Sequence, residues 1–234
     1  MKILMVISYF IPEIGSAAHV YFDLAKAFIK NGHQVDVITS YPRIFNLDKG
    51  DTGKKFPLEE KIDGVTVHRC KHYAKRDSIF FRGIEHFLLS RYYFKKYKKI
   101  NKKFDVCLIY IPPLPLFYFS RKIKRYDGTP SVLNFQDFHP QELTDVGVMK
   151  NRLIIKIMKY IERKSYKNAD YITVLSKGGV KYITDKVLSW AKAELAGDWT
   201  EVNQLKDLMG KLEESKKKDF KDYIFNLIFL SYLN

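Results

Sequence analysis

Residues 2–8 read K-I-L-M-V-I-S, a short apolar run with β-branched residues that predicts a buried strand. The next residues, Y-F-I-P-E-I-G-S at 9–16, form a connector rich in turn residues, and residues 17–31 have the apolar period of a helix. Gly32 stands where helices commonly end, and residues 34–39, Q-V-D-V-I-T, predict a second strand. Strand, loop, helix and strand in this order form a βαβ unit, which opens a parallel sheet.

The rest of the chain repeats this alternation. Further strands are predicted at residues 65–70, 105–110, 131–135 and 171–175. Helices are predicted at 78–103, after a proline-rich turn to about 125, at 151–168, and as a short last helix capped by 176–179. Residues 40–64 lack periodicity and predict a long loop. We therefore expect an α/β fold over residues 1–186: a Rossmann-like parallel sheet of about six strands with helices on both faces.

Three segments carry a resemblance to a known family. They are M-K-I-L-M-V-I-S-Y-F-I-P-E-I-G-S-A-A-H-V at 1–20, D-F-H-P-Q-E-L at 137–143 and A-D-Y-I-T-V-L-S-K-G-G at 169–179. As a set they resemble the amino-terminal domain of family 4 glycosyltransferases, retaining enzymes of the two-domain GT-B architecture, and within it a subgroup that builds bacterial and archaeal surface polysaccharides. The resemblance extends to about residue 186. It implies transfer of a sugar from a nucleotide-sugar co-substrate to a glycan or lipid-linked acceptor, without a bound cofactor.

The same resemblance suggests site residues. Gly15, Ser16 and Ala17 stand where the family places small residues that bind substrate or phosphate, and small residues before a helix also suit close approach by an anion. A compact turn of any α/β domain is the alternative. His139 and Asp137 are the predicted catalytic residues: the histidine would contact the sugar, and the carboxylate would accept a hydrogen bond from the acceptor hydroxyl. An ordinary surface histidine and a loop-capping aspartate are the alternatives.

The donor-binding half of such an enzyme is not recognisable. That half carries two glutamates in an E-x7-E arrangement and basic residues for the diphosphate, and nothing after residue 186 matches it. Residues 187–234 predict a helical appendage, which suits a deletion, a frameshifted gene or an engineered fusion equally well. The expectation is an incomplete enzyme, inactive as it stands or dependent on a partner chain or second domain.

The charge is uneven along the chain. The net charge is +15, yet residues 187–234 hold 7 lysines against 8 acidic residues, which leaves +16 for residues 1–186. Such an excess attracts anionic lipid, nucleic acid or phosphorylated substrates.

One predicted helix, 78–103, begins with apolar side chains on almost all sides and ends in a basic cluster. Aromatic residues beside lysines are typical of an interfacial membrane helix; burial between the sheet and a neighbour, with solvated lysines, is the alternative. The residues predicted to contact an anionic membrane are Arg91, Lys95, Lys96, Lys98, Lys99, Lys102 and Lys103.

Other chemistries lack a motif. No Walker A lysine motif and no His/Cys/Glu cluster with metal-ligand spacing is present, so no metal is expected. The connector is not G-x-G-x-x-G, which disfavours a nicotinamide enzyme. Cys70 and Cys107 lie in predicted strands and indicate buried thiols in a reducing compartment. With no recognisable signal peptide or spanning segment, we expect a cytoplasmic protein, with peripheral attachment at the inner face of the membrane as an extension of that expectation.

Three functions remain open from the sequence. The first is the glycosyltransferase domain described above, and the second is a non-catalytic membrane-surface or partner-binding module on the same fold. The third is nucleic-acid binding, which charge alone supports and no recognised motif accompanies, so no nucleic-acid partner is expected.

Overall fold

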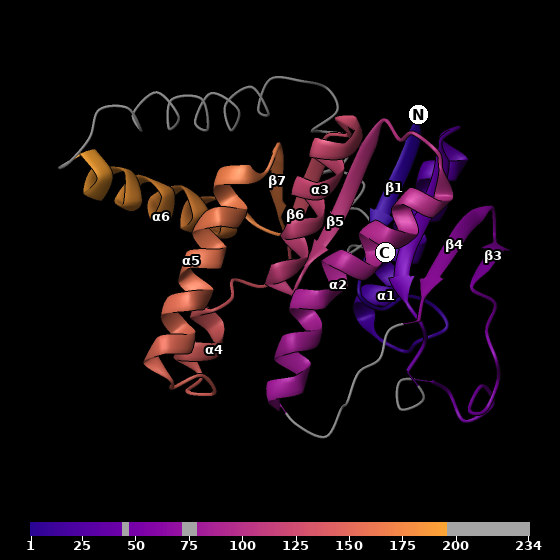
Figure 1. Ribbon diagram of the computed structural model, residues 1–234, viewed down its shortest axis with the longest axis horizontal. Coiled ribbons are helices and arrows are strands. Elements are labelled where there is room, and N and C mark those ends of the chain that lie inside the picture. The colour runs from indigo at the N-terminus through magenta and orange to yellow at the C-terminus, as the bar shows by residue number, and fades with distance from the viewer. Residues whose placement is uncertain (44–46, 72–78, 196–234) are drawn as a thin grey trace.

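The computed structural model describes residues 1–43, 47–71 and 79–195, with residues 79–84, 153 and 192–195 described by their backbone alone (Figure 1). Most of the predicted helical appendage, residues 196–234, lies outside the described residues.

A seven-stranded sheet forms the centre of the molecule, in the order β3-β4-β2-β1-β5-β6-β7. Its strands are β1 (Lys2–Val6), β2 (Gln34–Ser40), β3 (Glu59–Ile62), β4 (Val65–Cys70), β5 (Val106–Ile111), β6 (Ser131–Phe135) and β7 (Tyr171–Val174). All pairings are parallel except that of β3 with β4. The predicted α/β fold with a Rossmann-like parallel sheet is confirmed, and its six expected strands are all present.

The seventh strand, β3, falls in the stretch expected to be a loop. Its sequence E-E-K-I lacks the apolar alternation of a half-buried strand, because β3 is an edge strand whose side chains are exposed or half-buried. Asp63 and Gly64, both at positive φ (46° and 87°), turn it back onto β4. An Asp-Gly pair is a strong hairpin signal, so the sequence did contain the clue.

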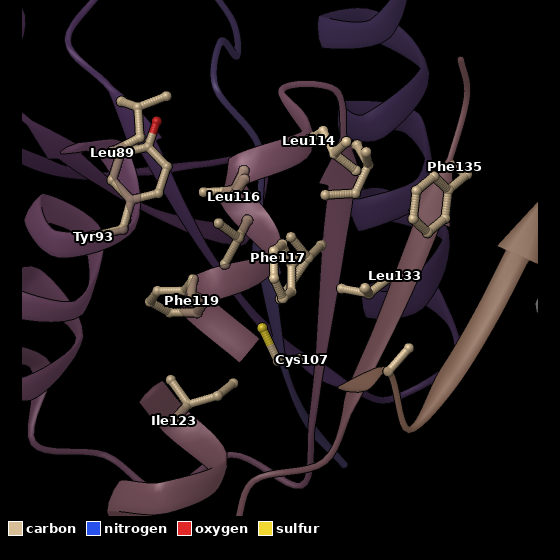
Figure 2. Packing of buried hydrophobic residues seen from close by; sticks show 14 of the residues in the cluster. Leu89, Tyr93, Cys107, Leu114, Leu116, Phe117, Phe119, Ile123, Leu133 and Phe135 are labelled. Carbon is tan, nitrogen blue, oxygen red and sulfur yellow. The ribbon is translucent and has the colours of Figure 1, made fainter. Parts of the chain in front are cut away.

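Helices cover both faces of the sheet unequally. Helix α1 (Ser16–Lys30) covers one face, with Tyr21, Leu24 and Phe28 packed against β1 and its neighbours. The other face carries η2 (Leu114–Leu116), α2 (Ile79–Ile100), α3 (Phe117–Asp127), α5 (Arg152–Asn168) and α6 (Lys177–Leu195). Figure 2 shows this larger core, in which Phe117 and Phe119 lie between the strands and α2.

Helix α2 supplies part of that core. Leu89, Tyr93 and Tyr97 are buried, and the Tyr93 hydroxyl lies 2.7 Å from Ser40 Oγ at the end of β2. The middle of α2 is therefore buried in the core, as the second of the two interpretations of this helix predicted. Phe87, nearer its start, is exposed.

Helix α6 is longer than the short last helix expected. It runs from Lys177 to Leu195 without interruption at residue 186, and Lys186 Nζ donates to Glu162 Oε1 on α5 at 2.8 Å. The division of the chain into residues 1–186 and 187–234 stays a prediction.

Candidate functional site

The parallel strands end at one edge of the sheet, the lower edge in Figure 1, and the site is built there. Open α/β sheets bind ligands at the carboxyl ends of their strands, where the chain order reverses. In this sheet β1 lies between β2 and β5, so the reversal falls at β1 and at the loop that leads from it to α1.

Helix α1 begins at this edge, and its amino terminus is open to a ligand. Gly15 precedes it in an extended conformation (φ 167°), and no side chain caps the helix. A Cβ added at Gly15 would meet no atom within 4 Å, so the glycine is not required by the backbone and leaves open space before the helix. Ser16 is exposed and Ala17 half-buried. An uncapped amino terminus carries partial positive charge, which favours an anion there.

Buried charges hold the loop between β1 and α1. Arg69 on β4 is buried; its Nη2 donates to the Ile11 carbonyl oxygen at 2.9 Å, and its Nη1 donates to Glu60 on β3. Glu13 is also buried, and its Oε1 accepts from the Arg43 backbone N–H at 3.2 Å. Sequence reasoning missed these residues, because an arginine within a strand and a glutamate within a loop give no pattern.

Arg43 adds a cation to the same edge. Its Nε lies 3.7 Å from Glu13 Oε1, and its guanidinium lies over the Tyr9 ring, 5.7 Å from the ring centre. The side chain keeps 27% of its surface exposed. Arg43 is thus held in place while part of it remains open to solvent.

An aromatic and amide network continues the site toward β6. The Tyr110 ring contacts Tyr9 and Tyr21 edge to face. The Tyr21 hydroxyl donates to Asn134 Oδ1 at 2.7 Å, and Gln136 Nε2 donates to the same oxygen. This network fixes the residues that lead into the loop after β6.

His139 and Asp137 both lie in that loop and are half-buried. Burial, together with the nearby Glu142 carboxylate, raises the pKa of Asp137, although His139 partly opposes the shift. The buried Nδ1 of His139 has no hydrogen-bond partner among the described residues. The loop is anchored by Phe138, whose ring lies 4.5 Å from that of Tyr182 on α6.

The two groups of predicted site residues share the sheet edge but are separate within it. Gly15, Ser16 and Ala17 follow β1, whereas Asp137 and His139 follow β6, a strand that lies two strand spacings, about 10 Å, from β1. No hydrogen bond joins the two groups in the described part of the chain.

The predicted membrane-contact residues lie elsewhere. Lys102 Nζ pairs with Asp36, near the start of β2, so the basic end of α2 reaches the amino-terminal edge of the sheet. Lys96 Nζ donates to the Leu58 carbonyl oxygen at 3.4 Å. The others, Arg91, Lys95, Lys98, Lys99 and Lys103, are exposed. This cluster does not surround the candidate site.

Among the described residues, no three side chains of His, Cys, Asp or Glu are grouped so as to hold a metal ion. None of the described helices combines the length and apolar character that crossing a membrane requires.

One family model matches most of the chain. The model of the "Glycosyl transferase 4-like domain" matches residues 15–196. The curated protein "Putative colanic acid biosynthesis glycosyl transferase WcaI" of Escherichia coli (strain K12) is 21% identical over 208 residues, which cover 86% of this chain and 51% of that protein. The chain therefore spans about half the length of the curated relative that it matches. Among solved structures, a ugt transferase from Siraitia grosvenorii in complex with UDP is 11% identical, with a TM-score of 0.47, over 83% of this chain and 48% of that one.

Proposed function

Because the chain belongs to the family of glycosyl transferase 4-like domains, we propose that it is the acceptor-side half of a retaining enzyme that transfers a sugar from a nucleotide-sugar to a glycan or lipid-linked acceptor. The family match across residues 15–196 is the observation that carries this proposal. The resemblance of the segments at 1–20, 137–143 and 169–179 to a surface-polysaccharide subgroup supports the acceptor class.

The carboxyl edge of the sheet suits this role. The uncapped start of α1 and the open space at Gly15 favour a phosphate, whether of the donor or of a lipid-linked acceptor. Arg43 contributes a nearby cation that Glu13 keeps oriented. Fixed positive groups of this kind stabilise the negative charge that develops on a departing diphosphate, so the chemistry does not require a metal.

Asp137 and His139 would serve the acceptor. A carboxylate with a raised pKa is a better hydrogen-bond acceptor and base than a fully solvated one, and on this proposal Asp137 receives the proton of an acceptor hydroxyl. His139, which is half-buried in the same loop, would contact a sugar hydroxyl. A second domain, on the same or another chain, would supply the glutamate pair and the remaining diphosphate contacts.

Calorimetric titration of the full chain tests the proposal. The probes are a polyprenyl diphosphate carrying one sugar, and UDP and GDP as donor fragments. We expect binding of the lipid-linked sugar and weak or no binding of either nucleotide, because the donor-side residues are not recognisable in this chain. The variant Gly15→Val fills the open space before α1 and should abolish acceptor binding.

Gly50→Val is the matched control, because an added Cβ there also meets no atom within 4 Å and the residue lies outside the site. It should bind the acceptor as the wild type does. Tight nucleotide binding with efficient turnover by this chain would contradict the division into two halves. Failure to bind any lipid-linked or free glycan acceptor would contradict the acceptor-side assignment.

A further inference from the structure

Large apolar side chains are exposed in one short segment, at the connection between α4 (Gln141–Asp145) and α5 and along the first turns of α5. We call residues 146–160 the α4–α5 tip. Val146 and Val148 are 72% and 74% exposed, and the tip also exposes Ile154, Ile157 and Tyr160. No other stretch of fifteen residues within the described ranges exposes as many. Exposed apolar side chains concentrated in this way are typical of a surface that contacts a partner protein or a membrane.

Full burial on α5 begins only after the first turns of the helix, at Ile161. Met158 and Ile161 pack against the large core, and Tyr166 follows on the same side of the helix. Tyr160 lies on another side of the helix, whereas Ile154 and Ile157 lie one turn before Met158 and Ile161 on the same side and are exposed. The helical period places Ile154, Ile157, Met158 and Ile161 on one face of α5, and of these Ile161 is buried, Met158 is partly buried and the other two are exposed.

The charges of the tip are of one sign. Residues 146–161 contain no acidic residue, and their four cations, Lys150, Arg152, Lys156 and Lys159, are all exposed. Glu162, the next acid along the chain, is buried against Lys186. The nearest acids before the tip are on α4: Glu142 accepts from the Phe138 backbone N–H, and Asp145 accepts from Gln141.

The charge and the apolar residues of the tip indicate what kind of partner it binds. A second copy of the chain would bring four cations against four cations, which opposes self-association. An anionic lipid surface complements the charges and accepts the apolar side chains among its acyl chains. We propose that the α4–α5 tip docks onto an anionic membrane surface, with Ile154, Ile157 and the two valines inserted and the lysines against the headgroups.

The placement of the tip gives the contact a consequence. α5 starts at the carboxyl edge of the sheet, and Figure 1 shows its first turns and the α4–α5 connection beyond the strand ends, at the lower left. Docking through the tip brings that edge, and Gly15 with it, toward the lipid. The significance of this orientation rests on the proposed function: a lipid-linked acceptor would reach the site from the same membrane.

The tip and the basic end of α2 predict different orientations. The lysines near Lys102 lie at the amino-terminal edge, so a membrane bound there would face away from the site. Variants of the two surfaces therefore distinguish them. Exposed side chains contribute little to folding, so all the variants should keep the wild-type melting temperature.

Vesicle sedimentation of the full chain is the test. The vesicles contain phosphatidylcholine with or without phosphatidylglycerol, and the salt concentration is varied. We expect binding only with phosphatidylglycerol, weakened by salt but not abolished, because insertion of apolar side chains is not screened. Lys156→Glu with Lys159→Glu should weaken binding by at least about thirtyfold, from the loss of two cations near the surface. Ile154→Ser with Ile157→Ser should remove the salt-resistant part.

Two control variants match these changes. Lys95→Glu with Lys99→Glu alters two exposed lysines of α2 at similar spacing, and Leu175→Ser with Val180→Ser alters two exposed apolar residues outside the tip. Both should bind as the wild type does. The proposal is overturned if the wild type never sediments with phosphatidylglycerol vesicles, if the α2 variant weakens binding as much as the tip variant, or if tip variants alter only the oligomeric state or the fold. Because no nucleotide-sugar or acceptor is present, failure here is distinct from failure of the acceptor titration.

Discussion

Replacing Arg69 with methionine tests the loop anchor of the site most sharply. Methionine keeps the length of the side chain but removes the cation that joins Glu60 on β3 to the Ile11 carbonyl oxygen in the loop before α1. Both acceptors then lose their donor in a place where Arg69 itself has no solvent access. The change therefore removes a buried support of the loop without altering a residue of the proposed binding site.

The magnitude follows from the burial of the pair. Removing one partner of a buried ion pair costs about 3–5 kcal/mol of unfolding free energy. Glu60 retains 25% of its side-chain exposure and is partly rehydrated, so we expect the lower end, about 3 kcal/mol. For a domain of this size each kcal/mol lowers the melting temperature by about 2–4 °C, which predicts a loss of about 6–12 °C.

Thermal unfolding measures the stability, and hydrogen exchange measures the loop. The backbone amides of residues 9–16 should exchange faster in Arg69→Met. Adding Glu60→Gln should recover part of the loss, because no unpaired carboxylate remains. Lys181→Met, which breaks the exposed pair with Asp185, should change stability by less than about 1 kcal/mol. Wild-type stability and unchanged loop exchange in Arg69→Met would refute the anchoring role.

Three further predictions concern the sheet and its edge. Burial raises the pKa of Cys70 to about 12 and that of Cys107 well above its usual value, so neither thiol should react with a disulfide reagent at pH 8 until the protein unfolds; rapid labelling of the native protein would contradict this. Burial alone would raise the pKa of Asp36, but hydrogen bonds from His68 and Lys102 outweigh it and lower the pKa, so this stabilisation is present above the unfolded pKa of about 4 and lost as the pH falls through the folded value. Asp36→Asn should accordingly lower the unfolding free energy by about 3 kcal/mol at pH 7 and progressively less below pH ~4, and a pH-independent difference in urea titrations would argue against the linkage. Gly179→Ala places a Cβ 2.9 Å from the Phe138 ring and should cost about 1–3 kcal/mol and weaken acceptor binding, whereas Gly178→Ala, whose Cβ makes only an ordinary 3.6 Å contact, should not; equal effects of the two would exclude the Phe138 contact as the cause.

The order of strands and helices could be predicted because the sequence of each element indicates how far that element is buried. The strands β1, β2, β5 and β6 are buried on both faces. β1 and β5 give apolar runs, and β2 and β6 combine apolar residues with a few buried polar ones such as Asp36 and Asn134, so all four are visible without any knowledge of their neighbours. β3 gave no such run because it lies at an edge, and only its Asp-Gly turn marked it.

The site could be predicted in part for the same reason. Small residues before α1 and polar residues after β6 follow from position along the chain. The contacts of Arg69 with Ile11 and of Glu13 with Arg43 join segments 58 and 30 residues apart, and nothing local specifies such pairs. The exposure of Ile157 was likewise invisible, since the periodicity of α5 shows an apolar face but not which part of it the core covers.

Hydrogen exchange of the full chain with and without the lipid-linked sugar tests the central claim most directly. Bound acceptor should protect residues 9–19 and 136–139, at the carboxyl edge of β1 and β6, and UDP or GDP at the same concentration should leave these segments unchanged. Protection confined to another part of the domain, or protection of this edge by nucleotide but not by the acceptor, would contradict the assignment of this chain to the acceptor side of a glycosyltransferase.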